Sequence, residues 1–214
     1  MAKFVTPLGK IDVTIIGHAS VLIEWNGLKI MTDPYSEIAD YTRQPVADLI
    51  LITHDHYDHL DTTALKPVTG KETVIISTPA VARLLPGVKP LKQGESFTYE
   101  GLHITATYAY NIEQKNEEGK VFHPRGAGNG YMLDFGGFRL YFAGDTELIP
   151  EMRELGPIDV AFLPKNLPFT MSDDMFIEAV KVIKPHNVCP YHFFQLDVEG
   201  LERRMPEGVK MFIK

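Results

Sequence analysis

Cysteine is nearly absent from this 214-residue chain, which contains only Cys189. A single cysteine cannot form an internal disulfide, so nothing indicates an oxidising compartment, and a metal site built from several thiolates is excluded. Long hydrophobic runs are also missing, because none approaches the roughly 18 residues of a membrane span. The first residues lack the apolar stretch of a signal peptide. We therefore predict a cytoplasmic protein that does not bind membranes.

Positive charge is scarce as well. The chain has 21 Lys and Arg against 28 Asp and Glu, a formal net charge of -7. The basic residues do not cluster, so we expect a small-molecule substrate and no nucleic-acid partner. A chain of this length can bury a good core, and no linker divides it, so we predict a single domain over residues 1–214. The sequence leaves the oligomeric state open.

Short apolar or β-branched runs between turn residues predict a chain rich in strands. They cover residues 11–16, 21–25, 28–32, 48–53, 73–77, 96–99, 103–107, 131–135, 138–143, 158–163 and 187–190. Helices are predicted over residues 62–66, 79–85 and 173–184. The polar, glycine-rich stretch 109–129 shows no regular pattern, and a loop of this length is usually functional or disordered.

Three histidines and two aspartates lie within six consecutive residues, His54-Asp55-His56-Tyr57-Asp58-His59. They follow the apolar run 48–53, at the point where a buried strand should end. Imidazole and carboxylate ligands together suit Zn²⁺, Mn²⁺ or Fe. The first two histidines can converge on one metal, and Asp58 with His59 can reach a second. A solvated histidine-rich surface is the alternative, which the position at a strand end disfavours.

Two later residues extend this candidate site. Two neighbouring cations repel each other, so a bridging carboxylate is expected between them. Asp145 is the candidate because it ends the predicted strand 138–143, beside Gly144, which lets the backbone turn closely. Its alternative role is that of a turn or helix-cap residue. His192 also lies at a strand end; alone it would be read as structural, but beside the other residues it is a candidate ligand.

The order of these residues resembles the metallo-β-lactamase superfamily. The His-x-His-x-Asp-His motif, Gly144-Asp145 and the late His192 follow the family's order over most of the chain. Asp33 matches the family's early aspartate, which supports the metal-binding loop from beneath. The resemblance implies an α/β fold, specifically a four-layer αββα sandwich with the metals at one edge between the two sheets. It implies Zn²⁺, one or two ions per chain, with Mn²⁺, Fe or Ni as alternatives.

The greatest similarity is to the small stand-alone metal-dependent hydrolases, which include ascorbate-6-phosphate-lactonase-like proteins. Gly17-His18-Ala19-Ser20 resembles their early Gly-His-Ser segment. The resemblance implies that His18 faces the active site and hydrogen-bonds substrate or a ligand carboxylate. A purely structural His18 is the alternative.

The chain departs from the family pattern after the central strands, where a further metal-binding histidine is usual. Residues 107–111 contain none. Tyr110 occupies its place, or His123 folds in from the long loop as a replacement. If His123 instead binds substrate or only packs, the first metal keeps an open position, which a catalytic metal needs for water in any case.

Two more residues are candidates for substrate binding. Arg125, in the glycine-rich part of the long loop, would bind a phosphate or carboxylate, with a solvated arginine as the alternative. Asn166 follows the predicted strand 158–163.

The resemblance implies a hydrolase in which a metal-bound hydroxide attacks a small ester, lactone, amide or phosphodiester. Asp58 would orient the nucleophile and accept a proton. The rival functions are a nuclease and a non-catalytic metal-binding or ligand-sensing module. The missing third histidine is the feature that favours the sensing module.

Overall fold

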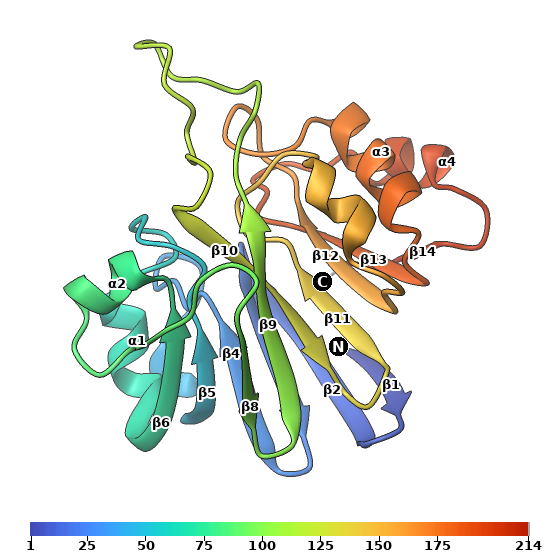
Figure 1. Cartoon of the computed structure of the whole chain (residues 1–214). Helices are drawn as coiled ribbons and strands as arrows, with labels where there is room; N and C mark the ends of the chain where they lie inside the picture. Colours follow the sequence, from blue (N-terminus) through green and yellow to red (C-terminus); the bar gives the residue numbers. More distant parts are fainter. Residues whose placement is uncertain (214) are drawn as a thin grey trace.

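The computed structural model describes residues 1–213, and two seven-stranded sheets face each other at its centre (Figure 1). The first sheet has, in order across it, β1 (Ala2–Thr6), β2 (Gly9–Gly17), β3 (Ser20–Trp25), β4 (Leu28–Thr32), β5 (Ala47–Leu51), β6 (Thr69–Ser77) and β7 (Lys89–Pro90). The second has β14 (Lys210–Met211), β13 (Asn187–Tyr191), β12 (Val160–Pro164), β11 (Arg139–Phe142), β10 (Gly128–Asp134), β9 (Leu102–Ala109) and β8 (Ser96–Tyr99). Each sheet is therefore built from one half of the chain.

Helices cover the outer face of each sheet. The first sheet carries α1 (Thr62–Val68) and α2 (Pro79–Leu84), with the 3-10 turn η1 (Tyr41–Arg43), and the second carries α3 (Asp173–Ile183) and α4 (Val198–Arg204), with the 3-10 turn η2 (Pro150–Glu154). Three buried clusters separate the layers. One lies between the sheets, and the other two lie between each sheet and its helices. This arrangement confirms the predicted four-layer αββα sandwich.

Local sequence explains the clearest helix, α3. The Ser172 hydroxyl accepts a hydrogen bond from the Met175 amide, and Asp173 and Asp174 occupy the first turn, where the helix dipole favours negative charge. The apolar stripe of Phe176, Ala179, Val180 and Ile183 is buried against the second sheet. The helix ends at Lys184, which adopts the left-handed conformation before Pro185.

Strand direction decides where the site forms. β4, β5 and β6 run parallel, and β2 shares their direction because two antiparallel pairings separate it from β4. In the second sheet β11, β12 and β13 run parallel, and β9 shares their direction for the same reason. The segments that follow these strands therefore meet at one edge of each sheet. The His192 amide donates to the His18 carbonyl oxygen at 2.9 Å, which joins the two edges.

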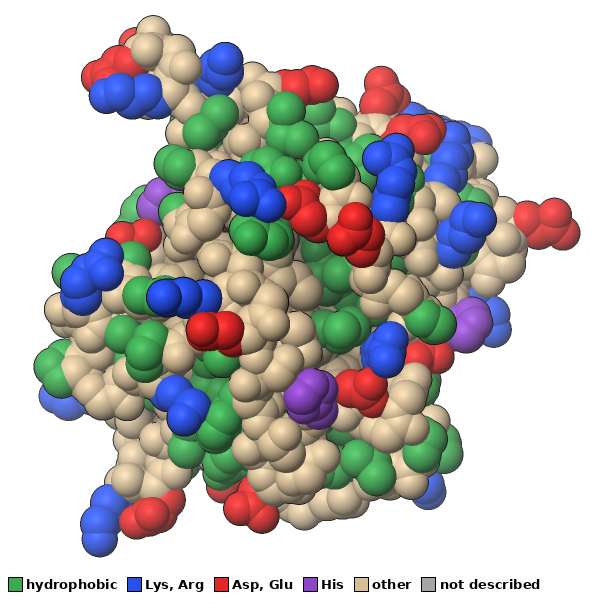
Figure 2. Space-filling view, in the orientation of Figure 1, with side chains coloured by type: hydrophobic (Ala, Val, Ile, Leu, Met, Phe, Trp, Pro, Cys, Tyr) green, Lys and Arg blue, Asp and Glu red, His purple; other side chains and the backbone are tan. Residues whose placement is uncertain are grey.

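The predicted long loop joins β9 to β10. Its outer part, held by a bridge between Lys115 and Val121, projects from the body of the molecule, while both of its ends return to the sheet edge (Figure 1). Basic and acidic side chains are interspersed over the face in Figure 2, so this view shows no large patch of one sign. No helix within residues 1–213 is long and apolar enough to cross a membrane.

Candidate metal centre

Side chains able to hold a metal converge at this edge in three overlapping groups, and the ligand atoms of each group lie within 4.8 Å of one another. The groups are His54, His56 and His123; His18, Asp58, His59 and His192; and His54, His59 and Asp145. The structure thus brings together every residue that the sequence predicted as a ligand, although they come from four separate segments. The second group also includes His18.

The two innermost histidines of the motif are oriented from beneath. The Thr53 hydroxyl donates to Asp33 at 2.7 Å and can therefore accept from Nδ1 of His54 at 3.0 Å. Nδ1 of His59 donates to Asp33 at 2.8 Å, and the Thr53 amide also donates to that carboxylate. Both imidazoles consequently present Nε2 to the cluster, the arrangement by which outer hydrogen bonds orient metal-binding histidines. Asp33 lies where the family resemblance expects it.

His123 comes from the long loop and is only 5% exposed. Its Nδ1 donates to Oδ1 of Asn111 at 2.6 Å, so Nε2 is the nitrogen that faces the cluster. That atom lies 3.2 Å from Nδ1 of His56 and 3.3 Å from Asp145. The loop therefore folds over the site as predicted. Tyr110 is not in the cluster, because its hydroxyl instead donates to Glu151 at 3.0 Å.

Asp145 lies at the centre of the cluster. Its two carboxylate oxygens are 3.4 Å from Nε2 of His59, 3.3 Å from Nε2 of His123 and 3.2 Å from Nε2 of His192. Gly144 makes this placement possible: its φ is +69°, and a Cβ there would lie 2.6 Å from a backbone oxygen. This geometry is what a carboxylate shared between two ligand groups requires.

The backbone is strained at three of the converging positions. His18, Asp33 and His192 have φ values of 49°, 34° and 55°, in the left-handed region that favours glycine. Nε2 of His18 lies 3.0 Å from Asp58, and its ring packs on that of His192 with centroids 3.9 Å apart. Burial lowers the pKa of His18 to about 3. Strain of this kind is retained where the surrounding structure holds residues for function.

Buried charges determine the electrostatics of the cluster. Burial holds the pKa of His54 well below its usual value, so that imidazole is neutral. Burial alone would raise the pKa of both aspartates, but His192 and His59 lower that of Asp145 well below its usual range and that of Asp58 to about 2. Burial likewise opposes protonation of His59, yet Asp145 raises its pKa well above the usual value. The carboxylates therefore attract positive charge to the cluster.

The donor set fits a divalent transition metal. Two nitrogens that are each about 2.0–2.1 Å from a tetrahedral ion are about 3.3 Å apart. Nε2 of His59 and Nε2 of His192 are 3.1 Å apart, which places two potential lone pairs face to face. Nε2 of His54 and Oδ1 of Asp145 are buried without a hydrogen-bond partner. Buried polar atoms are costly unless paired, and a cation would pair both.

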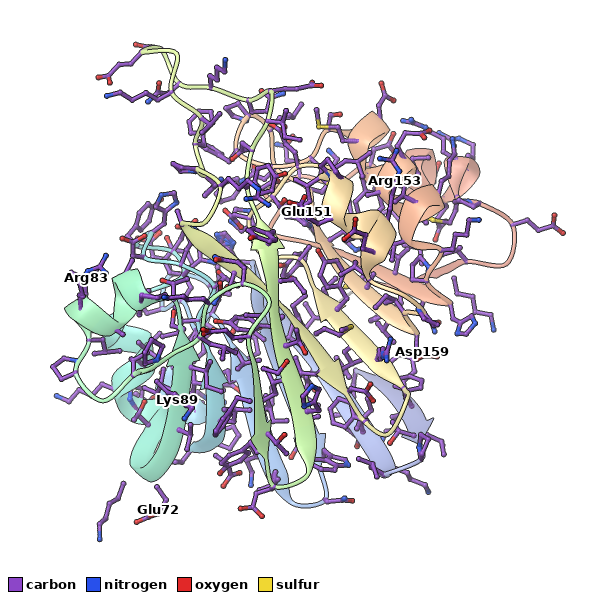
Figure 3. The ribbon with its side chains drawn as sticks, in the orientation of Figure 1. Glu72, Arg83, Lys89, Glu151, Arg153 and Asp159 are labelled. Atoms are coloured by element: carbon purple, nitrogen blue, oxygen red, sulfur yellow. The ribbon has the colours of Figure 1, made fainter. Side chains whose placement is uncertain are left out.

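A pocket of about 170 Å³ opens beside the cluster. Its lining residues are His56, Tyr57, Asp58, Phe122, His123, Asp145, Asn166, Phe169, His192 and Phe194. Asn166 thus lies where a substrate-binding residue is expected. Arg125 does not: it donates to Glu151 at 2.8 Å and stacks on Tyr108, with Glu151 labelled on η2 in Figure 3. The sequence predicted that Arg125 binds substrate, because the sequence does not reveal which acidic residue a loop arginine pairs with.

Three supporting residues were missed by sequence reasoning: Thr53, Asn111 and Glu147. Glu147 is 1% exposed, accepts from the backbone amides of residues 112–114 at 2.7–2.8 Å, and accepts from the Asn111 side chain at 3.1 Å. It therefore anchors the loop end that orients His123. The only sequence signal was position, since Asn111 and Glu147 closely follow predicted strands.

Comparison with known proteins identifies the family. Residues 12–192 match the model of the beta-lactamase superfamily domain. The chain belongs to the metallo-β-lactamase superfamily. It is 30% identical over 203 residues to a UPF0173 metal-dependent hydrolase of Methanosarcina mazei, covering 89% of this chain and 86% of the relative. It is 34% identical over 193 residues to that of Anoxybacillus flavithermus, covering 85% of each.

Solved structures of similar proteins share this fold. A protein from Parabacteroides distasonis, described as a metal-dependent hydrolase, superposes with a TM-score of 0.94 at 39% identity, covering 100% of this chain and 97% of the other. Igni18, a metallo hydrolase from Ignicoccus hospitalis, shares the fold with a TM-score of 0.78 at 24% identity, covering 95% and 94%. The superfamily member described here is a metal-dependent hydrolase. Its resemblance to ascorbate-6-phosphate-lactonase-like proteins stays a prediction.

Proposed function

We propose that this hydrolase cleaves a small ester, lactone, amide or phosphodiester in the pocket beside Asp145. The observation that carries the proposal is the position of Asp145, which lines the pocket and lies 3.2–3.4 Å from at least one histidine of each of the three ligand groups. His54, His56 and His123 would hold one metal, Asp58, His59 and His192 a second, and Asp145 would be shared. Zn²⁺ is the ion proposed, with Mn²⁺, Fe or Ni as alternatives. When bound, such ions lower the pKa of water and polarise the bond to be cleaved.

The protein's own groups would orient the reaction. The low pKa of Asp58, about 2, keeps its carboxylate ionised at neutral pH, so it can accept a hydrogen bond from a water molecule and orient it. We assign the acceptance of the water's proton to the same carboxylate. Nε2 of His18, 3.0 Å away, would fix the rotamer of that carboxylate. The Asn166 side chain, in the pocket wall, would donate a hydrogen bond to a substrate oxygen.

Metal content and turnover, measured together, test this proposal. Protein never exposed to chelator should carry one or two equivalents of transition metal, by elemental analysis, and should hydrolyse at least one of a panel of generic esters, lactones, amides and phosphodiesters. Bound metal without turnover on any class would instead support the sensing module. Less than about half an equivalent of Zn, Mn, Fe and Ni combined would contradict the proposed ligand set.

The structure does not favour either rival function, the ligand-sensing module or the nuclease. The apparent absence of a third histidine favoured the sensing module, and His123 now lies 3.2 Å from His56, where such a histidine is needed. A nuclease would need cationic groups along a nucleic acid path. The pocket lining contains no lysine or arginine. The proposal therefore keeps a small molecule as the substrate. A cytoplasmic location stays a prediction from the sequence.

A further inference from the structure

The pocket wall has a simple composition once the proposed metal ligands are set aside. The remaining lining residues are Tyr57, Phe122, Asn166, Phe169 and Phe194, which are four aromatic rings and one amide. The rings of Phe122 and Phe169 meet edge to face, with centroids 4.9 Å apart. Tyr57 is 74% exposed and Phe194 79% exposed, so apolar surface is left uncovered around the opening. Clustered exposed apolar surface marks a binding site.

Two basic side chains that flank lining residues in the sequence are paired elsewhere. Arg125 is bound to Glu151 and stacked on Tyr108. Lys165 precedes Asn166, but its ammonium lies 2.6 Å from Asp173. The wall therefore offers nothing to neutralise an anionic group of a substrate other than the group at the metals, and such recognition normally uses Arg or Lys.

We propose that the substrate is an uncharged carboxylic ester or lactone with an apolar acyl group, which rests on the function proposed above and narrows its substrate class. The acyl group would lie among the four rings, and the Asn166 amide would donate to an oxygen of the ester. The small pocket, about 170 Å³ against the ~300–1,000 Å³ of sites for drug-sized ligands, limits that group to a few carbons or one ring.

The reaction is a hydrolysis that consumes one water molecule. The water oxygen bonds to the acyl carbon, and the acyl carbon–oxygen bond breaks. One water proton ends on the departing alcohol oxygen, and the new carboxylic acid releases the other. No oxidant or second substrate is needed. The carboxylate product is anionic, and a wall without cations favours its release.

A series with one leaving group tests the substrate class. The metal-loaded protein is assayed on 4-nitrophenyl acetate, butyrate and hexanoate and on bis(4-nitrophenyl) phosphate, each rate being divided by its uncatalysed rate at the same metal concentration. Each methylene moved from water to an apolar wall contributes about fourfold. Butyrate has two more methylenes than acetate, so we expect kcat/KM to rise about fifteenfold between them. Turnover confined to the phosphodiester would overturn this inference while leaving the proposed hydrolase intact.

Variants of the rim test where the acyl group lies. Phe194→Ser and Phe169→Ser change side chains that are 79% and 39% exposed, so the fold should survive. Both should reduce the butyrate-to-acetate ratio of kcat/KM about fivefold or more, because the longer acyl group loses more contact with the wall than acetate does. Leu84→Ser is the matched control, because Leu84 is also an exposed apolar residue, at 63%, but lies on α2 outside the pocket. A ratio unchanged by both phenylalanine variants would refute the assigned wall.

Binding to metal-free protein supplies a readout that does not depend on turnover. Isothermal titration with benzamide and with phenylphosphonate compares an uncharged and an anionic ligand that carry the same ring. Benzamide should bind at least about tenfold more tightly, and Phe169→Ser should remove the difference. Tighter phenylphosphonate binding would contradict an uncharged substrate. If no ester, lactone, amide or phosphodiester turns over in the metal-loaded protein, the function proposed above fails, and the binding experiment still tests the pocket separately.

Discussion

The motif segment His54–His59 and the residues that reach the site from elsewhere are built in different ways. The motif follows one strand, and its inner histidines rest on Thr53 and Asp33, a support formed at two neighbouring parallel strand ends of one sheet. The distant contributors are His123, Asp145 and His192, which come from the second sheet or its long loop. The motif half of the site therefore depends on strand pairing within one sheet, and the distant half depends on the packing of two sheets.

This difference shows where the site is vulnerable. Asp145 approaches His59 from across the interface between the sheets, and His123 depends on a loop held by Asn111 and Glu147. Changes to these supports should displace the distant half of the site, which consists of His123, Asp145 and His192, while the motif segment keeps its conformation. The experiments below separate the two halves, beginning with the change expected to have the largest effect.

Removal of the metal should affect both halves together. Without cations, the buried carboxylates and facing imidazoles lose the charge that pairs them, so chelation should abolish hydrolysis, and return of Zn²⁺ or Mn²⁺ should restore it. A ligand that binds only the folded state adds about 2.7 kcal/mol of stability at 100 times its Kd. The free energy of unfolding, measured by urea denaturation with and without metal, should rise accordingly. Equal stability and activity after complete chelation would show that the cluster holds no functional metal.

Asp145→Ala should have the next largest effect, because it removes the carboxylate that lies 3.2–3.4 Å from His59, His123 and His192. The variant should lose the second metal and lower kcat/KM by more than the roughly 10–100-fold typical of an orienting residue. The circular dichroism spectrum should remain native. Asp55→Ala is the matched control, since Asp55 is exposed within the motif and belongs to no ligand group. Full metal content with near-normal turnover would make Asp145 only a turn residue.

Asn111→Ala should affect the distant half alone. It removes the acceptor that fixes Nδ1 of His123, so metal affinity should fall about 10–100-fold, as for other orienting partners. Competition with a chromogenic chelator measures this affinity. Glu113→Ala, an exposed change in the same loop, should leave it unchanged. If both variants bind metal like the native protein, the loop does not position a ligand.

Arg125→Ala should have the smallest effect, with kcat/KM within about twofold of native on every substrate. Burial opposes ionisation of Glu151, but Arg125 lowers its pKa below 4.5. Because the pKa of Glu151 is lowered in the folded state, the ion pair stabilises the fold at any pH above the ordinary pKa of glutamate. This stabilisation is lost as the pH falls through the lower pKa of the folded state. The difference in urea midpoint between native and variant should therefore shrink from pH 7 to pH 3. A large loss on anionic substrates alone would restore Arg125 to the substrate site.

Much of the fold was predictable because its signals are local. The hairpin at Asn26-Gly27 and the capped, striped helix α3 each follow from a few neighbouring residues. β1, β7, β14 and α4 were missed, since they are short or lie at exposed edges where the hydrophobic pattern is weak. The helix predicted over residues 62–66 continues through Pro67, and α1 ends at Val68.

The sequence by itself determined the chemistry of this protein: imidazole and carboxylate at the ends of buried strands, with no thiolate alternative. The pattern of apolar runs in the sequence predicts which residues lie at strand ends, and parallel strands bring those ends to one edge of a sheet. Only the tertiary structure decided that His123 rather than Tyr110 enters the cluster, and that Arg125 pairs with Glu151 outside the pocket. Those choices depend on how an 18-residue connection between β9 and β10 (residues 110–127) folds back. Its path is held by Glu147 and Asn111 through contacts that no local pattern encodes.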